Sequence, residues 1–532
     1  MSLNKAEVQH FIPSIDNATI DGSHTVEAHQ KIMSLDRLGE LISSIKSNKK
    51  IVHCHGVFDL LHIGHIKHLQ QAKALGDLLV VSITADFFVN KGPGRPHFSD
   101  ILRSEALAAL SCVDFVVVNH HATAIEAINI IKPDLYVKGM EYQAAENDIT
   151  GKITEEEFAV KTVGGQLVFT EGVVFSSSSL LNQYFSSHTP EIKDYLNQIK
   201  ANYPITDLWD YFKKSSSLKV LLIGEAIIDI YHYGEAIGKS GKEPVLVTKY
   251  HREEMYIGGI LAVASHLSSF CSEITCITAI GEKGEYEPFI RENLKDNIET
   301  LFHYKKESPT TIKRRYIEEY SSQKLFEIYE INDCYFDDEQ KKAFMSNIEE
   351  QIAAHDVVIV TDYGHGLLDS DCIELIENKA KFLAVNTQAN AGNHGFNCIS
   401  KYKKADYVCI ANRELQLDFR QKHITTLEQM NRLMRDFDYG TVVVTNGING
   451  LYVCHNGEEI SSAPALTNSV KDRVGAGDAV LAITSLLCAQ NAPAELIGFI
   501  GNVVGAAAVN IMGNKSFVEK VPLMKHILNL MK

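Results

Sequence analysis

The chain has 532 residues, which is too long for one ordinary hydrophobic core and predicts at least two domains. Its 45% hydrophobic and 22% charged residues are typical of folded globular proteins and exclude a largely disordered or fibrous chain. The formal net charge of −16 disfavours nucleic acid and anionic membrane surfaces as partners, so phosphate must be bound locally by loops and helix ends. Because the sequence offers neither a signal peptide nor an apolar run of membrane-spanning length, we expect a cytoplasmic protein.

The amino-terminal part of the chain predicts one α/β domain. Residues 1–45 carry only a weak helical pattern, and we treat them as an extension of unknown role. Between residues 51 and 180, β-branched runs such as IVHC and DLLVVSIT alternate with helical patterns such as IKHLQQAKAL. This alternation predicts βαβ units and a mainly parallel sheet. We therefore assign residues 46–186 to a first α/β domain.

The rest of the chain predicts a linker and a second, larger α/β domain. Residues 187–217 contain Pro190, Pro204 and the polar run KKSSS, and we interpret them as a linker. A new strand, KVLLIG, begins at Lys219, and apolar strands follow at DVVIV, FLAVN, DYVCI and TVVVT. These patterns fit one domain over residues 218–532, in which alternating stretches such as PVLVTKY and TIKRRYIEEY predict a small β-sheet lid.

The first candidate site is the stretch GVFDLLHIGHIKHL at residues 56–69, which follows a predicted strand and starts a predicted helix. It places His62 and His65 on either side of Gly64. A glycine there lets a phosphate approach the backbone, while the imidazoles and the helix N-terminus supply donors for nucleotidyl transfer. Two structural histidines are an alternative. A metal site is another, because five histidines fall within residues 53–68, although the Glu that accompanies the His pair of zinc hydrolases is absent.

The pattern GxFDxxHxGH after a strand resembles the signature of cytidylyltransferase-like nucleotidyltransferases, and NKGPGRP, VKGMEY and TEGVVFSSSSLLN match later elements of that family. The resemblance implies a Rossmann-like fold and attack by a sugar-phosphate oxygen on the α-phosphate of ATP or CTP, with release of pyrophosphate. It implies catalytic roles for His62, His65 and Lys91. Nucleotide binding would then fall to Gly56, Phe58, Asp59, Gly64, Arg103, Lys138, Gly139, Ser176, Ser177 and Ser178. A solvated Lys91 and a structural Arg103 are the alternatives for these two cations.

The second candidate site is DRVGAGDAVLAITSLL at residues 472–487, a glycine-rich turn that opens into an apolar helix. The backbone N–H groups of Gly475, Ala476 and Gly477 predict an anion hole for a transferring γ-phosphate. Asp478 is then placed to act as the general base that takes the proton of a sugar hydroxyl. A structural glycine turn with an Asp near the helix start is the alternative.

Residues 218–532 resemble the ribokinase-like, or phosphofructokinase B, sugar kinases through KVLLIGEAIIDIYHYG, YIGGILAVASHLSSF, TDYGHGLL and VTNGINGLYV. The resemblance implies a ribokinase-like α/β domain with a β lid, and Mg²⁺ held near Glu414. It implies sugar binding by Asp229, Gly258 and Gly259, and ATP binding by Glu414, Thr445, Gly447, Gly450, Gly475, Ala476, Gly477 and Asn502. Two elements depart from the family: ANREL places Asn412 only two positions before Glu414, and VNTQ, with Asn386 and Gln388, replaces a DPK-like strand end.

Together the two regions resemble bifunctional heptose 7-phosphate kinases and heptose 1-phosphate adenylyltransferases of lipopolysaccharide precursor synthesis, with the two halves in reversed order. This implies a sugar phosphate and a nucleoside triphosphate as substrates, an NDP-sugar such as ADP-heptose as product, and a homodimer with an edge near residues 244–250. One alternative is CTP-dependent activation of another sugar or polyol. Another is a kinase half that has lost turnover and serves as a regulatory or dimerising module, which the altered elements favour and the intact GAGD opposes.

Overall fold

The computed structural model describes residues 29–89, 92, 95–140, 152–170, 189–421, 423–467 and 470–531. The chain forms two compact units, Met1–Val89 with Arg95–Leu181, and Asn90–Gly94 with Asn182–Lys532. The predicted phosphate-binding residues Lys91, Ser176, Ser177 and Ser178 lie outside the described residues. Within the described ranges, no helix is both long enough and apolar enough to cross a membrane.

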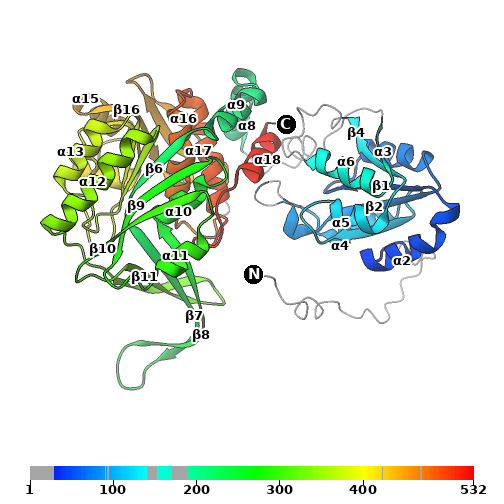
Figure 1. Ribbon diagram of the computed structural model, residues 1–532, viewed down its shortest axis with the longest axis horizontal. Helices are drawn as coiled ribbons and strands as arrows, with labels where there is room; N and C mark the ends of the chain where they lie inside the picture. The colour runs from blue at the N-terminus through cyan, green and yellow to red at the C-terminus, as the bar shows by residue number, and fades with distance from the viewer. Residues whose placement is uncertain are drawn as a thin grey trace. The chain divides into compact units, whose positions relative to one another are not determined.

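The first unit is built on a parallel five-stranded sheet in the order β3-β2-β1-β4-β5. Its strands are β1 (Ile51–Gly56), β2 (Leu78–Thr84), β3 (Phe115–Asn119), β4 (Leu135–Gly139) and β5 (Gln166–Thr170). The helices that flank the sheet in Figure 1 are α2 (Leu35–Ile45), α3 (Ile63–Ala74), α4 (Asp100–Ala108), α5 (Ile125–Ile131) and α6 (Lys152–Thr162). The direction of winding changes between β1 and β4, and ligands of such sheets bind beyond the strand ends at that point. The predicted Rossmann-like fold is confirmed, and this crevice lies beside Gly56 and Gly139.

Part of the amino-terminal extension belongs to the first unit. Helix α2 places Leu38 and Ile42 in a buried cluster with Val80 of β2 and Val117 of β3. Burying a Leu or Ile side chain contributes roughly 1.5–3 kcal/mol relative to leaving it exposed. The weak helical pattern in residues 1–45, to which no role was assigned, thus corresponds to α2, which is part of the core of this α/β unit.

The range 187–217, expected to be a linker, contains α8 (Pro190–Asn202) and α9 (Ile205–Ser215), which belong to the second unit. Phe212 of α9 is 1% exposed, and its ring centroid lies 5.7 Å from that of Phe270. The polar run KKSSS thus begins in the last turn of amphipathic helix α9, where Lys213 and Lys214 are exposed and Ser215 is buried, and the linker interpretation is corrected.

The second unit contains a nine-stranded sheet in the order β10-β9-β6-β13-β14-β15-β16-β17-β18, parallel from β10 to β16 and antiparallel beyond. The strands are β6 (Lys219–Gly224), β9 (Glu273–Gly281), β10 (Ile298–Lys305), β13 (Val357–Asp362), β14 (Leu383–Thr387), β15 (Lys404–Ala411), β16 (Asp438–Thr445), β17 (Leu451–His455) and β18 (Ser461–Ala463). One face is covered by α12 (Asp338–Ala354), α13 (Ser370–Lys379), α14 (Asn412–Phe419) and α15 (Thr426–Asp436). The other face is covered by α10 (Ile260–Leu267), α16 (Ala476–Cys488) and α17 (Ala494–Ala508), while α11 (Glu287–Asn293) and α18 (Lys520–Leu530) lie further out.

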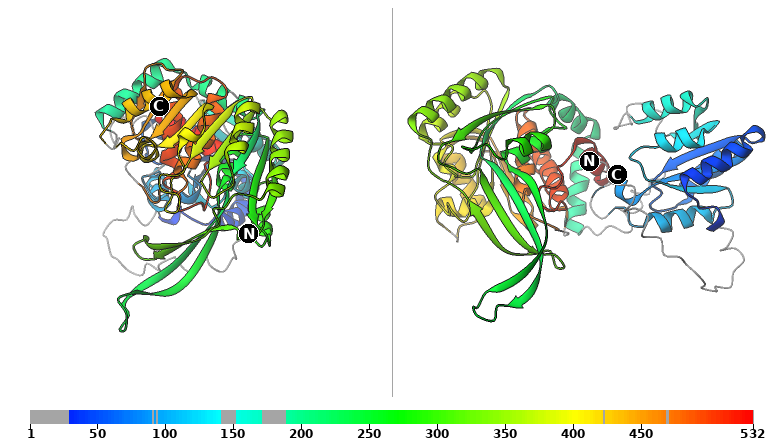
Figure 2. Two further views of the ribbon diagram at one scale, coloured as in Figure 1. Left: turned by 90° about the vertical axis from the view of Figure 1, so that its left-hand side faces the viewer. Right: turned by 60° about the horizontal axis from the view of Figure 1, so that its bottom comes forward.

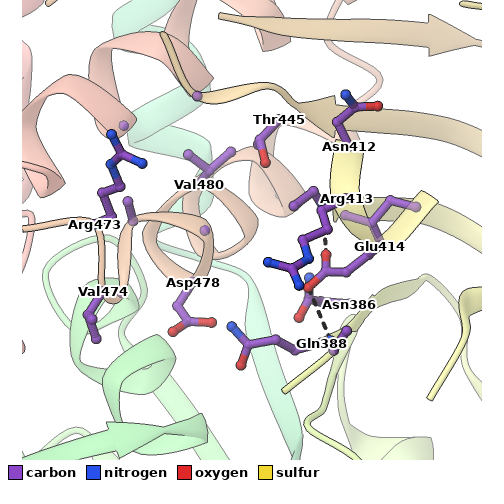
Figure 3. Close-up of a pocket in the computed structure, with 18 of the residues that line it drawn as sticks. Asn386, Gln388, Asn412, Arg413, Glu414, Thr445, Arg473, Val474, Asp478 and Val480 are labelled. Atoms are coloured by element: carbon purple, nitrogen blue, oxygen red, sulfur yellow. Dashed lines mark hydrogen bonds between the residues drawn. The ribbon is translucent and has the colours of Figure 1, made fainter. Parts of the chain in front are cut away.

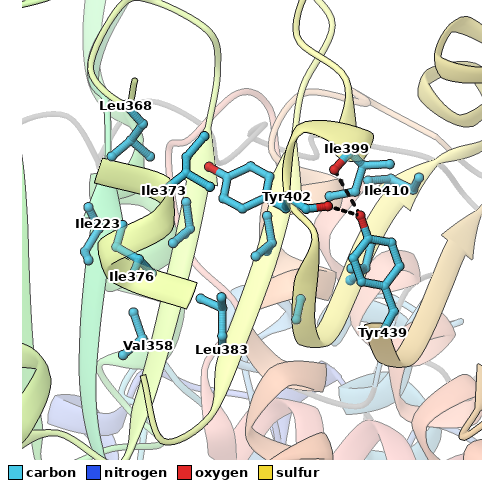
Figure 4. Packing of buried hydrophobic residues seen from close by; sticks show 14 of the residues in the cluster. Ile223, Val358, Leu368, Ile373, Ile376, Leu383, Ile399, Tyr402, Ile410 and Tyr439 are labelled. Atoms are coloured by element: carbon cyan, nitrogen blue, oxygen red, sulfur yellow. Dashed lines mark hydrogen bonds between the residues drawn. The ribbon is translucent and has the colours of Figure 1, made fainter. Parts of the chain in front are cut away.

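The main hydrophobic core of the second unit lies between the nine-stranded sheet and the helices α12 to α15 (Figure 4). Strands such as VVIVTD in β13 are apolar over most of their length because both faces of a parallel sheet are covered by helices. Tyr439 is also buried there, and its hydroxyl donates to the carbonyl oxygens of Ile399 and Tyr402 at 3.0 and 2.7 Å. These bonds satisfy the one polar atom that the side chain brings into the core.

A separate four-stranded sheet, in the order β12-β11-β7-β8, forms the lid. Its strands are β7 (Ala226–Lys239), β8 (Leu246–Gly259), β11 (Thr311–Glu318) and β12 (Gln323–Glu330). Strands β7 and β8 form a long hairpin that extends away from the larger sheet (Figure 2). The ribokinase-like α/β fold with a small β lid is confirmed.

Candidate active sites

His62 caps the amino-terminal end of α3 in the first unit. Its Nδ1 accepts a hydrogen bond from the backbone N–H of Gly64 at 3.1 Å. In the neutral ring the proton must then be on Nε2, which is buried and has no partner among the described residues. Burial also lowers the pKa of His62, which favours the neutral ring. A buried N–H donor at a helix N-terminus is suited to a phosphate oxygen.

The predicted glycine, phenylalanine and histidines of this motif lie together. The rings of His62 and His65 stack with their centroids 3.9 Å apart, and Phe58 contacts His65 edge-on at 5.1 Å. Phe58 has a φ of 51°, in the left-handed region, where strain is tolerated mainly at special positions. A Cβ at Gly56 would come within 3.0 Å of the Phe58 ring, so any larger residue at the end of β1 would displace this ring.

The other histidines of this region are structural. His53 and His55 both hydrogen-bond to Ser82 Oγ, at 2.7 and 2.8 Å, and His68 to Thr170 Oγ1 at 2.8 Å. Burial lowers the pKa of His53 to about 3 and that of His68 to about 4. Within the described part of the chain, no three His, Cys, Asp or Glu side chains are placed to hold a metal ion. The metal alternative for the histidine motif therefore has no geometric support there.

Asp59 anchors the loop before α4. Its carboxylate accepts hydrogen bonds from Arg95 Nη1 at 2.8 Å and from the backbone N–H groups of His97 and Phe98 at 2.7 and 3.1 Å. Burial opposes ionisation of Asp59, but these bonds outweigh it and lower the pKa of the carboxyl group. Asp59 thus holds the segment around residues 95–98 in place, and its nucleotide-binding role stays a prediction.

Arg103 is buried, although we expected it to neutralise phosphate. Its guanidinium donates to the carbonyl oxygens of Phe98, Val57 and Thr84 at 2.9, 2.6 and 2.8 Å. It also pairs with Asp86 at 2.6 Å, and its side chain is only 1% exposed. These four partners and the burial give Arg103 the structural role that was the alternative, and the phosphate-neutralising expectation is corrected.

Lys138 and Gly139 end β4, on the other side of the crevice from Gly56. Lys138 forms a largely buried ion pair with Glu156 of α6, with Nζ and Oε2 2.9 Å apart. The geometry therefore ties this predicted nucleotide-binding lysine to a carboxylate of its own unit.

A cavity of about 1610 Å³ in the second unit lies at the carboxyl ends of β14, β15 and β16 and reaches the lid. It brings together nearly all of the predicted kinase residues, including several that are far apart in the sequence. Those that line it are Asp229, Gly259, Glu414, Thr445, Gly447, Gly450, Gly475, Ala476, Gly477, Asp478 and Asn502.

The glycine turn at the start of α16 opens into this cavity. Gly475 is the N-cap, with a φ of 77°, and a Cβ there would lie 2.6 Å from Asn514 Oδ1. A Cβ at Gly477 would meet no atom within 4 Å, so the space in front of this residue is open. The first-turn N–H groups of an α-helix have no partner within the helix. This end of α16 can therefore receive an anion.

Asp478 lies in the first turn of α16, and its carboxylate points into the cavity opposite Gln388 (Figure 3). Burial raises the pKa of Asp478 to about 6. Its Oδ1 accepts a hydrogen bond from the Tyr363 hydroxyl at 2.9 Å, while no described residue donates to Oδ2. At neutral pH the carboxylate is ionised and has one oxygen available to accept a proton.

Asp229 lies on the lid side of the cavity, next to the predicted glycine pair Gly258 and Gly259. Its carboxylate is bound by Arg315, and Asn514 Nδ2 donates to Oδ2 at 3.1 Å. A Cβ at Gly258 would lie 2.4 Å from the same Oδ2, so only glycine fits. Gly259, with a φ of 59°, turns the chain into α10. These residues present an oriented carboxylate to a polar ligand.

The turn between β16 and β17 forms another wall of the cavity. Gly450 has a φ of 83°, and a Cβ there would lie 2.0 Å from the carbonyl oxygen of Ala463. Asn502 of α17 donates to that same oxygen at 2.9 Å. Thr445 and Gly447 lie on the cavity side of this turn. The turn is thus packed closely on Ala463 and is held in place from α17.

Glu414 faces the cavity, but both of its carboxylate oxygens accept hydrogen bonds from the protein backbone (Figure 3). They accept from the backbone N–H groups of Ala411 and Ala389 at 2.7 and 3.2 Å. Burial raises the pKa of Glu414 to about 7, as expected for a carboxylate with no cation partner among the described residues. The remaining lone pairs fit a hydrated divalent cation. Asn412 instead bonds to Asn446 and Thr426 at 3.2 and 2.9 Å, which leaves it outside such a donor set.

Two further residues of the cavity escaped the sequence analysis. Tyr363 lies within the quoted TDYGHGLL motif, but nothing in the motif indicates a partner on α16. Lys313 lies on β11 among three consecutive basic residues. Because side chains alternate across a strand, at least one of the three had to face the covered side of the lid. The run of three basic residues in a predicted strand was therefore the signal that could have indicated Lys313.

An open parallel sheet, a β lid and a glycine turn followed by an aspartate define the second unit as a carbohydrate kinase. Residues 217–520 match the pfkB family carbohydrate kinases, and the chain belongs to this family. Residues 53–192 match the cytidylyltransferase-like family, so this domain precedes the kinase.

The bifunctional protein HldE of Helicobacter pylori strain P12 is 40% identical over 164 residues, which are 30% of this chain and 32% of that protein. HldE of Syntrophotalea carbinolica is 43% identical over 122 residues, which are 22% of this chain and 25% of that protein. The chain thus spans about a third of the length of the curated relatives it matches. Escherichia coli phosphofructokinase-2 in complex with potassium is similar over 59% of this chain and 100% of its own, with 15% identity and a TM-score of 0.49. Arabidopsis thaliana ribokinase is similar over 59% of this chain and 99% of its own, with 15% identity and a TM-score of 0.45.

Proposed function

We propose that this protein is a bifunctional sugar-activating enzyme. Its kinase domain phosphorylates a sugar or sugar phosphate with ATP, and its nucleotidyltransferase domain converts a sugar 1-phosphate and ATP or CTP to an NDP-sugar and pyrophosphate. The observation that carries the proposal is the position of Asp478, directly after an anion-binding glycine turn and in one cavity with Asp229.

In the proposed kinase reaction, Asp229 orients the acceptor sugar and Asp478 Oδ2 takes the proton of the attacking hydroxyl. The hydroxyl oxygen forms a bond to the γ-phosphorus as the bond to the ADP oxygen breaks. N–H groups of the turn from Gly475 to Gly477 hold the transferring phosphoryl oxygens. Glu414 would hold Mg²⁺ through its remaining lone pairs, and the ion would supply positive charge to offset that of the triphosphate.

In the proposed nucleotidyl transfer, a phosphate oxygen of the sugar 1-phosphate attacks the α-phosphorus and pyrophosphate leaves. His62 Nε2–H donates to one oxygen of the reacting phosphate, and the imidazole of His65, stacked on His62, is the proposed second donor to the charge of the transition state. Lys91 and Ser176 to Ser178 remain proposed ligands of the triphosphate.

The two activities belong together chemically. A kinase that phosphorylates an anomeric hydroxyl produces the phosphate nucleophile that the nucleotidyltransferase needs. The similarity to HldE proteins supports an ADP-heptose-like product of lipopolysaccharide precursor synthesis, with the two halves in reversed order. A second candidate is a CTP-dependent cytidylyltransferase with a regulatory kinase domain, which the altered ANREL and VNTQ elements favour.

We extend the proposal to a cytoplasmic homodimer. The proposed substrates, a nucleoside triphosphate and a sugar phosphate, are those of a cytoplasmic enzyme, and β8 is an edge strand of the lid with Leu246 and Tyr250 exposed. Light scattering of the wild type and of Tyr250→Asp tests this interface. A monomeric wild type would contradict it.

The test of the function is a substrate screen. Free and phosphorylated heptoses and hexoses are paired with ATP or CTP, and ADP and pyrophosphate are measured separately. We expect one acceptor to support ADP formation and its 1-phosphate to support pyrophosphate release. Pyrophosphate release without ADP formation from any acceptor would favour the second candidate, and absence of both products would contradict the proposal.

A further inference from the structure

Lys313 is a buried lysine in the wall of the kinase cavity that the mechanism above does not use. It lies on β11, in register with Asp229 of β7, and is only 6% exposed. It lines the same cavity as Asp478 and Tyr363. Its Nζ lies 5.3 Å from the Tyr329 ring centroid and 5.9 Å from that of Tyr363, and it forms neither an ion pair nor a hydrogen bond with any residue that the structure describes.

The charges around Lys313 leave its ammonium group without a contacting anion. Asp229 is bound by Arg315 and Asn514, and Asp478 by Tyr363. The titratable groups that interact electrostatically with Lys313 include these two aspartates, Glu225, Arg315 of its own strand and His365. Burial lowers the pKa of Lys313, in line with an ammonium that has lost water and gained no direct partner. Such a group is costly unless an anion arrives to pair with it.

We propose that Lys313 binds a phosphoryl group in the kinase cavity, as the cation that faces the γ-phosphoryl group while it moves to the oxygen held by Asp478. The proposal rests on the proposed kinase function. An ammonium offers three donors and stabilises the charge spread over the phosphoryl oxygens during transfer. A phosphate already present on the acceptor has the same chemistry, so the experiment must distinguish these two sources.

The test compares Lys313→Met, which removes the charge and keeps an unbranched side chain, with Lys249→Gln, which removes the same charge from an exposed position of the lid. Hydrogen–deuterium exchange of peptides covering residues 472–487 reports nucleotide binding at this site separately from the first unit. The full chain is titrated with MgADP and with the magnesium complex of adenylyl imidodiphosphate, a non-hydrolysable ATP analogue that keeps a γ-phosphoryl group.

If Lys313 faces the γ-phosphoryl group, Lys313→Met weakens binding of the ATP analogue at least tenfold and that of MgADP less than twofold. The kcat for ADP formation then falls at least 100-fold with phosphorylated and unphosphorylated acceptors alike. If Lys313 faces an acceptor phosphate instead, analogue binding is unchanged and only the KM of the phosphorylated acceptor rises. If Lys313→Met binds the ATP analogue and forms ADP as well as the wild type, the proposal is overturned. Absence of ADP formation by the wild type contradicts the kinase function, while the binding arm still tests Lys313.

A stability measurement separates this role from a structural one. Removing a buried, unpaired charge should leave the Tm of the nucleotide-free protein unchanged or raise it, and Lys313→Arg should retain part of the analogue affinity. A lowered Tm for Lys313→Met, with no rescue of binding by Lys313→Arg, would make Lys313 a structural residue and overturn the proposal.

Discussion

The hydrogen bond between Tyr363 and Asp478 makes a quantitative prediction for the kinase. Tyr363→Phe removes the hydroxyl that donates to Asp478 Oδ1 at 2.9 Å and keeps the buried ring. Burial raises the pKa of Asp478 to about 6, and the Tyr363 bond works against that rise. A hydrogen bond to a charged group contributes ~1.5–3 kcal/mol, and 1.36 kcal/mol corresponds to one pH unit. Loss of the bond should therefore raise the pKa of Asp478 by roughly 1–2 pH units, to ~7–8.

The sign of the effect follows from the role of the base. Only ionised Asp478 accepts a proton, so kcat should fall about tenfold per pH unit below its pKa. The wild type should be near its plateau at pH 7, because the pKa of Asp478 is about 6. Tyr363→Phe should be ~2- to 10-fold slower at pH 7 and should recover above pH 9.

The assay is ADP release at saturating MgATP and acceptor between pH 5 and pH 9.5. The matched control is Tyr329→Phe, which removes a hydroxyl from the same cavity that bonds to Glu327 at 2.6 Å. In the control, the pH at which kcat for ADP release falls to half of its plateau value should be the same as in the wild type. An unchanged half-plateau pH in Tyr363→Phe, or an equal loss of rate at every pH, would refute the reasoning.

Three further predictions concern the scaffold. Arg103→Gln should lower the stability of the first unit by ~1–3 kcal/mol for each buried carbonyl oxygen that loses its donor, whereas the half-exposed Asp86 is solvated; thermal unfolding measures this. A kinase fragment beginning at residue 189 should be more stable than one beginning at residue 216, since the latter lacks buried Leu208 and Phe212, each contributing ~1.5–3 kcal/mol. Gly450→Ala should raise the KM for ATP severalfold, because a Cβ cannot fit 2.0 Å from the carbonyl oxygen of Ala463.

Each of these predictions has a contradicting outcome. A normal unfolding temperature for Arg103→Gln would mean that water replaces the lost donors. Equal stability of the two kinase fragments would show that α8 and α9 are dispensable. An unchanged KM in Gly450→Ala would show that the turn shifts without affecting the nucleotide. Gly457→Ala is the matched control for Gly450→Ala, since Gly457 also has a positive φ, of 73°, but its Cβ would meet no atom within 4 Å.

The sequence predicted both folds because these depend on short, local patterns. Alternating apolar runs indicated the parallel sheets, and a glycine turn before an apolar helix located Asp478. The errors concerned interactions that no local pattern contains. Arg103 is buried through partners on three separate segments, and α9 became a core element only because Phe270 is available to cover Phe212.

Two independent activities in one chain are tested most directly by two single substitutions assayed side by side. His65→Ala should reduce pyrophosphate release ~30- to 1,000-fold and leave ADP formation intact, because a lost transition-state donor costs ~2–4 kcal/mol. Asp478→Asn should reduce ADP formation ~10²- to 10⁴-fold and leave pyrophosphate release from a supplied sugar 1-phosphate intact. If either folded variant loses both ADP formation and pyrophosphate release, the two activities are not independent. If both variants keep both activities, the catalytic roles of His65 and Asp478 are contradicted.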